Sequence, residues 1–545
     1  MKNILKISIA ALVSAALFSS CIKEVFPTDR ATEGQVAESP TALEAMVKGI
    51  PAALVMAGSL GYAQDGQAWD FALPAIHIAT ESMTGDLIIS GDTGYDWFSQ
   101  WGMNQALGSD YAVGALTWNN YYTWIKSAND IIGTVDESAL TEETKSILGI
   151  AYTYRAMFYL DLVRLYEFKE NKYTSGSNVI GLGVPIVTPE TTEAEAKANP
   201  RASVEDVYSK IIFPDLDKAE TLLAGYTAPD KYTLSLAVVY GLKARAYLER
   251  GTAGEAGAYA SAADYARKAI TASGCTPLTQ AEWEDPSTGF NSAASNNSWM
   301  WAVALPSESV ANLFNFTAHM STEESWTSYG WRVGRAINKS LYQLIDAKDF
   351  RKYSWLDPNR DLYPYKSCRP DGAAHFATNL KDYANIKFRP AQGAYSDYKV
   401  GGAADHVCMR VEEMYFIEAE ATAHVNLANA IQLLNKFMAY RITDGSYDCS
   451  AKSTSVASFT EELMLQKRVE FWGEGIVMFD MKRLGMSSLR GYKGTNAPAD
   501  YRLNCDGPAP YWNFVITRGE TQNNPAVADY NNPDPSETVT PWVDK

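Results

Sequence analysis

Two polar stretches of the chain carry an unusual number of aromatic side chains. Residues 91–101 include Tyr95, Trp97 and Trp101 among glycines and aspartates, and residues 326–331 include two more tryptophans. Aromatic faces with polar edges can stack on the C–H faces of sugar rings while neighbouring polar groups bond the hydroxyls. The chain has 14 Trp and 32 Tyr, more than a core requires. The alternative is that these tryptophans fill the core, since large proteins distribute aromatic residues both inside and outside.

The sequence lacks the short motifs of the common catalytic sites, because it contains no HExxH, GxSxG, GxxxxGK[ST] or GxGxxG. Residues 357–361 imitate the start of a calcium loop, but Leu362 stands where that loop needs glycine and Cys368 where it needs a glutamate. No local pattern indicates the facing carboxylates of a glycosidase. We therefore predict no cofactor, no metal and no enzyme. The histidines show no metal-ligand spacing and are expected to be surface or core residues: His77, His319, His375, His406 and His424.

The N-terminus has the pattern of a lipoprotein signal peptide. Two lysines precede a largely apolar run over residues 7–18, which is too short to span a bilayer that needs roughly 20 apolar residues. Two serines then precede Cys21. We expect residues 1–20 to be removed, Cys21 to carry a diacyl or triacyl lipid, and residues 21–40 to form a flexible tether. An ordinary signal peptide or a short membrane anchor is the alternative.

The net charge of the chain limits its possible partners. A net charge of -17 argues against a nucleic-acid partner or an anionic membrane surface.

The five cysteines besides Cys21 are widely spaced and form no CxxC, so neither a metal site nor a disulfide framework is indicated. Their odd number leaves at least one thiol unpaired: Cys275, Cys368, Cys408, Cys449 and Cys505.

Helical periodicity is strong in the first half of the chain. Apolar residues recur every three to four positions over residues 147–165, as one buried face of a helix requires. Over residues 201–223, Ser203 and Asp206 are spaced like a capping box ahead of an apolar stripe. We expect Pro214 to kink or interrupt that helix, because proline cannot donate a backbone hydrogen bond.

Two segments have the pattern of tetratricopeptide-like helix pairs, in which small side chains let neighbouring helices approach closely. Neither segment shows the full repeat consensus, so each could also be a generic helical hairpin. The contact faces are expected to carry Tyr240, Ala244, Tyr247, Ala262, Ala266 and Ala269 in the first pair, and Met414, Ile417, Ala421, Ala430, Leu434 and Phe437 in the second.

Residues 271–404 have a different character, rich in Ser, Asn, Gly, Pro and aromatics with little periodicity. Long irregular segments inside a compact protein are usually functional. A short strand is predicted within residues 296–305. A helix over residues 458–484, begun by a capping box of Ser458 and Glu461, is predicted to close the helical part, and the tail beyond it to be coil.

Seven blocks follow one another along the chain behind Cys21. Each alone is a weak helical pattern, but together they resemble the SusD/RagB family of surface nutrient-binding lipoproteins of Bacteroidetes. Phe471 after Glu470, and Val477, depart from the usual family pattern. The blocks are WNNYYTWIKSANDII (118–132), AYTYRAMFYLDLVRLYE (151–167), GLGVPIVT (181–188), RASVEDVYSKIIFPDLDKAETLL (201–223), YTLSLAVVYGLKARAYLERG (232–251), CMRVEEMYFIEAEA (408–421) and LMLQKRVEFWGEGIVMFDMKRLG (463–485).

The resemblance implies a mainly α fold and one domain over residues 41–545. About four tetratricopeptide-like helix pairs would form a scaffold over residues 110–270 and 405–490. A large irregular half with a few short strands would lie over residues 50–110 and 271–404 and bind the ligand.

The resemblance also implies a location and partners. The lipid on Cys21 would sit in the outer membrane with the protein facing the exterior. There the protein would bind oligosaccharide or polysaccharide without catalysis and deliver it to a SusC-like TonB-dependent transporter. Competing hypotheses are a surface glycosidase or peptidase, and an adaptor that binds peptide, glycoprotein or another protein.

In the family, the loop ahead of the Trp/Tyr-rich helix and the middle irregular region meet at the ligand site. We therefore predict that the two aromatic stretches form the site in this chain. The predicted stacking platforms are Trp97, Trp101, Trp326 and Trp331, and the predicted hydroxyl partners are Asp92, Tyr95, Asp96 and Arg332.

Overall fold

The computed structural model describes residues 39–58, 60, 67–89, 96–327, 329–362 and 364–543. The predicted signal peptide, the lipid site at Cys21 and all but the last two residues of the tether lie outside these ranges. Among the described helices, none combines the length and the apolar character needed to cross a membrane.

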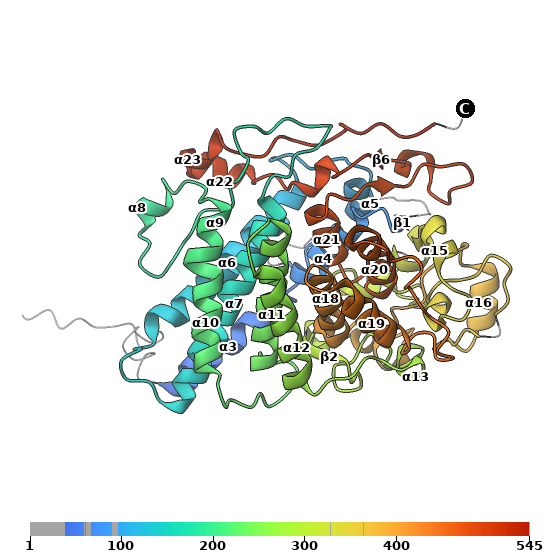
Figure 1. Cartoon of the computed structure of the whole chain (residues 1–545), viewed down its shortest axis with the longest axis horizontal. Helices are drawn as coiled ribbons and strands as arrows, with labels where there is room; N and C mark the ends of the chain where they lie inside the picture. The colour runs from blue at the N-terminus through green and yellow to red at the C-terminus, as the bar shows by residue number, and fades with distance from the viewer. Residues whose placement is uncertain are drawn as a thin grey trace, which may run out of the picture.

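The fold is mainly α. Figure 1 shows α6, α7, α10, α11 and α12 standing side by side, with α18 to α21 next to them, and successive members of the series from α6 to α12 contact one another. The bounds of the longer helices are α6 (Ala112–Thr134), α7 (Glu142–Tyr166), α10 (Phe213–Leu222), α11 (Leu236–Thr252), α12 (Ala258–Ser273), α18 (Val411–Ala423), α19 (Leu427–Met438) and α20 (Val456–Glu470).

The predicted helix over residues 147–165 is confirmed as α7, which begins earlier because Thr141 accepts a hydrogen bond from the backbone N–H of Thr144. The segment after Arg201 is also helical but is divided in three. Ser203 caps α9 (Val204–Val207), a π-helical turn follows, and α10 starts beside Pro214. The predicted interruption at Pro214 is therefore confirmed, and it takes the form of a locally widened helix.

Both predicted helix pairs are present, as α11 with α12 and α18 with α19. Ala262, Ala266 and Ala269 have no exposed surface, so α12 approaches its neighbours closely, as small side chains allow. Because α12 also packs on α18, the two pairs form one continuous helical body.

The prediction of a single helix over residues 458–484 is wrong in two respects. The capping box is Ser455 with Ser458, so α20 starts at Val456 and ends at Glu470. The chain then turns through Gly473 and Gly475, whose positive φ angles of 81° and 78° favour glycine, before α21 (Val477–Arg483). A Cβ on Gly475 would lie 2.4 Å from the Cα of His77, so this turn also needs glycine for close packing.

The strands of the described residues form three small antiparallel sheets. They are β1 (Leu87–Ile89) with β3 (Arg335–Ile337), β2 (Trp299–Val303) with β4 (His406–Arg410), and β5 (Ser488–Leu489) with β6 (Asn504–Cys505). The predicted strand within residues 296–305 is confirmed as β2. The sheets bring distant parts of the irregular region against each other and against the helical body.

Further helices complete the structure. One of them, α4, is almost wholly buried although it falls in a stretch predicted to be irregular. Their bounds are α3 (Pro40–Ala53), α4 (Ala72–Ser82), α5 (Trp97–Gly102), α8 (Glu193–Ala196), α13 (Gln280–Trp283), α14 (Phe316–Met320), α15 (Lys339–Leu344), α16 (Gly372–Thr378), α17 (Tyr398–Gly401), α22 (Arg518–Asn523) and α23 (Pro525–Ala528), with π turns η1 (Tyr208–Ile212) and η3 (Tyr329–Gly334) and the 3-10 turn η4 (Phe350–Ser354).

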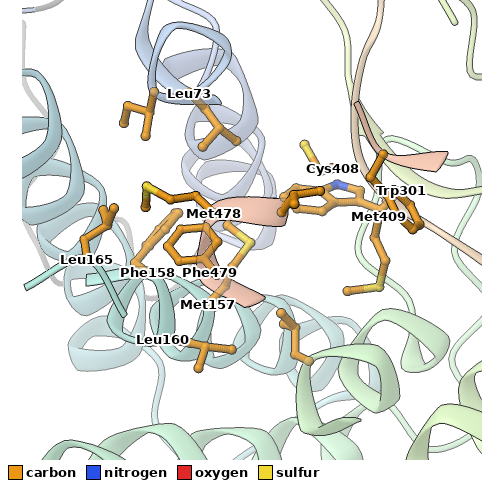
Figure 2. Packing of buried hydrophobic residues seen from close by; sticks show 14 of the residues in the cluster. Leu73, Met157, Phe158, Leu160, Leu165, Trp301, Cys408, Met409, Met478 and Phe479 are labelled. Atoms are coloured by element: carbon orange, nitrogen blue, oxygen red, sulfur yellow. The ribbon is translucent and has the colours of Figure 1, made fainter. Parts of the chain in front are cut away.

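One hydrophobic core joins the helical body to the irregular region. Figure 2 shows Leu73 of α4, Phe158 of α7, Trp301 of β2, Met409 of β4 and Phe479 of α21 gathered around the same interior. The buried cluster reaches from Leu43 to Val539. The irregular region is therefore part of the folded unit, and it adds a second, small cluster of Leu356, Phe376, Leu380, Ala384 and Ile386.

A buried carboxylate, Glu470, holds several of these elements together. It accepts hydrogen bonds at 2.7 to 2.9 Å from Arg351, Arg410 and Arg441. Burial alone would raise the pKa of Glu470, but the charges of the three arginines outweigh burial and hold its pKa well below the usual value. Further carboxylates balance the arginines: Asp349 for Arg351, Glu412 for Arg441 and Glu474 for Arg410.

We predict that Glu470→Ala lowers the free energy of unfolding by about 3–5 kcal/mol, because it leaves buried arginines without their partner. Urea unfolding followed by circular dichroism measures this loss. The matched control is Glu461→Ala on the exposed face of the same helix, which should change stability by less than about 0.5 kcal/mol. Equal effects of the two substitutions would contradict the role given to Glu470.

A second buried carboxyl, Glu81 of α4, predicts a pH dependence of stability. One of its oxygens accepts a hydrogen bond from the N–H of Gly475 at 3.2 Å, and the other has no partner among the described residues. Burial raises the pKa of Glu81 to about 8. A raised pKa means that the folded state holds the proton more tightly, so the contribution of Glu81 to stability is greatest below pH 4.5 and is lost as pH rises through about 8.

Glu81→Gln should remove this pH dependence, because the amide stays neutral and keeps an oxygen for Gly475. We expect the variant to match the natural protein near pH 4.5 and to exceed its stability by about 3–5 kcal/mol at pH 9. Urea unfolding across this pH range gives both curves. Curves that run parallel at all pH values would show that Glu81 is ionised in the folded protein.

Candidate functional site

The structure brings the two aromatic stretches together. Strand β1 pairs with β3, with Ile89 opposite Arg335. Asp96, which precedes α5, then accepts a hydrogen bond from the guanidinium of Arg335 at 2.7 Å. Both side chains have no exposed surface. Since Arg335 directly follows η3, this pair places the start of α5 beside the segment that carries the second aromatic stretch.

A neutral histidine ring packs between the same two segments, α5 and η3. His319 of α14 stacks on Tyr329 of η3 with a centroid distance of 4.5 Å, and on Phe71 at 5.2 Å. Its edge meets Phe98 of α5 at 5.1 Å. Burial lowers the pKa of His319 to about 4, so the ring is neutral at pH 7 and packs like an apolar aromatic side chain.

Three of the predicted platforms have exposed surface. Trp97 at the start of α5, and Trp326 and Trp331 around η3, are each partly exposed. The indole N–H of Trp331 donates to the carbonyl of Thr327 at 2.8 Å, which fixes the orientation of its ring. Arg332 is exposed, with its guanidinium carbon 6.0 Å from the centroid of the Trp331 ring.

Two predictions about this site are wrong. Trp101 has no exposed surface and packs edge-on against Trp69 and Phe98, so it belongs to the core. Asp96 is buried by its ion pair with Arg335 and is not free to bond a ligand hydroxyl. Asp92 and Tyr95 lie outside the described residues.

The turn that carries Trp326 is held by two buried glutamates. Glu324 accepts hydrogen bonds from the backbone N–H and the hydroxyl of Thr327 at 2.7 and 2.9 Å, and burial raises its pKa to about 7. Glu323 is paired with Arg389. The ring of Trp326 rests against the backbone of Gly401, where an added Cβ would come within 2.7 Å of it.

Tyr329 is a site residue that the sequence reasoning missed. It lies between Trp326 and Trp331, is partly exposed, and is held by the stacking of His319. The signal was present, because Tyr329 falls within the aromatic stretch that was singled out. His319 itself gave no signal, since two of its ring partners, Phe71 and Phe98, are more than 200 residues away in the sequence.

Trp97, Trp326, Tyr329 and Trp331 are the partly exposed aromatic residues at the start of α5 and around η3. Three sizeable clefts of the structure, with volumes of about 400, 620 and 550 Å³, are lined by none of these four residues. Within the described ranges, no three His, Cys, Asp or Glu side chains are grouped to hold a metal ion.

We predict that Asp96→Ala lowers the free energy of unfolding by about 3–5 kcal/mol, because Arg335 is left buried and unpaired. The double substitution Asp96→Ala with Arg335→Met should recover most of this loss, since a buried pair replaced by apolar groups is often neutral. Urea unfolding of both variants measures the difference. A loss below about 1 kcal/mol for Asp96→Ala, which is typical of an exposed pair, would contradict the prediction.

Comparisons with known proteins agree on one family. A sequence model for a family described as starch-binding and associating with the outer membrane matches residues 72–248, and a model for the SusD family matches residues 279–539. No curated protein matches the chain in a sequence search.

Solved structures share the fold. A SusD-like carbohydrate-binding protein from Bacteroides vulgatus is 21% identical with a TM-score of 0.69, over 93% of this chain and 98% of that one. A SusD superfamily protein from Bacteroides thetaiotaomicron is 20% identical with a TM-score of 0.67, over 91% and 100% of the two chains. Because the two family models together span most of the described sequence, the chain belongs to the SusD/RagB family.

Proposed function

We propose that the chain captures oligosaccharide or polysaccharide at the cell surface, without catalysis, and delivers it to a SusC-like TonB-dependent transporter. The observation that carries the proposal is the convergence of α5 and η3, which leaves Trp97, Trp326, Tyr329 and Trp331 partly exposed on buried, well-anchored supports. A carbohydrate-binding protein and a putative sugar-binding protein among the similar structures give further support.

The proposed mechanism is stacking combined with hydroxyl contacts. Each ring face offers apolar surface to the C–H groups of a sugar, and the guanidinium of Arg332 offers donors to hydroxyl oxygens. Buried contacts hold the residues beneath the rings, namely Asp96 with Arg335 and His319 with Tyr329, which should lower the cost of ordering side chains on binding. A lipid on Cys21 would anchor the protein to the outer membrane, facing the exterior, where the ligand and the transporter meet.

We predict that Trp97→Ala and Trp326→Ala each weaken oligosaccharide binding about two- to tenfold, the loss expected for one stacking contact. Isothermal titration calorimetry of the full-length protein, in a detergent without a sugar headgroup, measures this with maltoheptaose, xylohexaose and mannohexaose as probes. Trp542→Ala is the matched control, because Trp542 is partly exposed outside the site, and it should leave binding unchanged.

The same experiment separates the alternatives. Release of shorter products from the probes would indicate a glycosidase. A protein that binds no probe yet co-purifies with a transporter would be an adaptor. Unchanged binding in both tryptophan variants would place the sugar site elsewhere on the protein.

A further inference from the structure

A cleft of about 400 Å³ opens between the start of α6 and α22, away from the tryptophans of the proposed site. In Figure 1, α22 lies near the upper edge of the molecule, above the helical body. Residues from three separate segments line the cleft, among them Trp69, Asp110, Tyr111, Thr517, Arg518 and Gln522. Its volume falls within the range of sites for small molecules.

The cleft has an aromatic wall. The side chain of Tyr111 is 45% exposed although the residue directly precedes a long helix. Its hydroxyl makes no hydrogen bond to the described part of the chain, so the ring is not committed to packing or capping. Trp69 is buried behind the cleft and packs edge-on against Trp101 with a centroid distance of 6.3 Å. The wall is therefore anchored in the main core.

The cleft also offers a hydroxyl that packing does not use. Thr517 is 6% exposed as a residue and precedes α22, yet its hydroxyl makes no cap hydrogen bond and none to any other described residue. The hydroxyl oxygen keeps access to solvent, and Thr517 lines the cleft. A ligand hydroxyl in the cleft can therefore bond to it.

The rim of the cleft carries both hydrogen-bond donors and hydrogen-bond acceptors. Arg518 contacts Asp110 at 3.3 Å, and both side chains are more than half exposed. Such a pair is weak, and it leaves most guanidinium donors and one carboxylate oxygen available. Gln522, which is exposed, adds one acceptor and two donors. The opposite charges balance, so the rim suits neutral hydroxyl groups better than an anion.

We propose that this cleft is a second sugar-binding site, in which a neutral pyranose unit stacks on Tyr111 and bonds Thr517, Asp110, Arg518 and Gln522 through its hydroxyls. The proposal rests on the proposed function, since it assumes that the ligands of this chain are glycans. It assigns to α6 and α22 a role separate from that of α5 and η3.

Equilibrium dialysis of the full-length protein with radiolabelled maltotriose, xylotriose and mannotriose tests the proposal by counting sites. We expect two molecules of one of these trisaccharides per chain at saturation. Tyr111→Ala should weaken one of the two sites about two- to tenfold and leave the other unchanged, Trp97→Ala together with Trp326→Ala should weaken only the other site, and the combination of all three should weaken both. Thr517→Val should weaken the second site about two- to tenfold by removing one hydrogen bond.

Two control variants test whether a weakened site reflects the missing Tyr111 ring or a general loss of folding. Tyr111→Phe keeps the ring and should keep both sites. Tyr440→Ala removes a tyrosine that is 38% exposed at the end of α19, and it should also leave the count at two.

The outcomes separate the two proposals. One site per chain that Tyr111→Ala leaves unchanged would overturn the second site and leave the proposed function standing. Loss of co-purification with the transporter in Tyr111→Ala, at an unchanged sugar count, would make the cleft a protein contact and also overturn it. Absence of binding of all three trisaccharides would overturn the proposed function, and the second site with it.

Discussion

The structure depends on a carboxylate that three arginines share. Glu470 ends α20, while Arg351, Arg410 and Arg441 come from η4, the end of β4 and the chain just after α19. A buried charge is tolerated only when its partners are in place, so these four segments must assemble together. Lys387 extends the network by donating to the carbonyls of Glu470 and Trp472 and to Glu474. Through Lys387 and Arg351 the irregular region is fixed to the helical body by charge as well as by the hydrophobic core.

Part of this network lies in the two C-terminal blocks that resemble the family in sequence. Glu470 and Glu474 lie in the last block and Arg410 in the block before it, and their identities are set by the charges that they face. The ligand surface carries no such constraint, because its aromatic rings need only a support beneath them. The family resemblance is therefore informative about the scaffold and silent about the particular sugar.

The sequence predicted the helices well and their ends less well. A period of 3.6 in the apolar residues located α7, α11, α12, α18 and α19. Ser458 and Glu461 had the spacing of a capping box, but Ser455 offered the same chemistry one turn earlier and α20 begins there. At the site, the family resemblance predicted that the two aromatic stretches lie close together. The burial of Trp101 and Asp96 could not be predicted, because it depends on Trp69 and Arg335, and no local sequence pattern reveals where those residues lie in space.

The main core, which includes residues of both regions, has a consequence for how such a protein can diversify. The buried cluster runs from Leu43 to Val539 and includes residues of both the helical body and the irregular region. Replacing the whole irregular region would therefore remove part of the hydrophobic core. New ligand preferences must then arise by replacement of side chains on an unchanged frame.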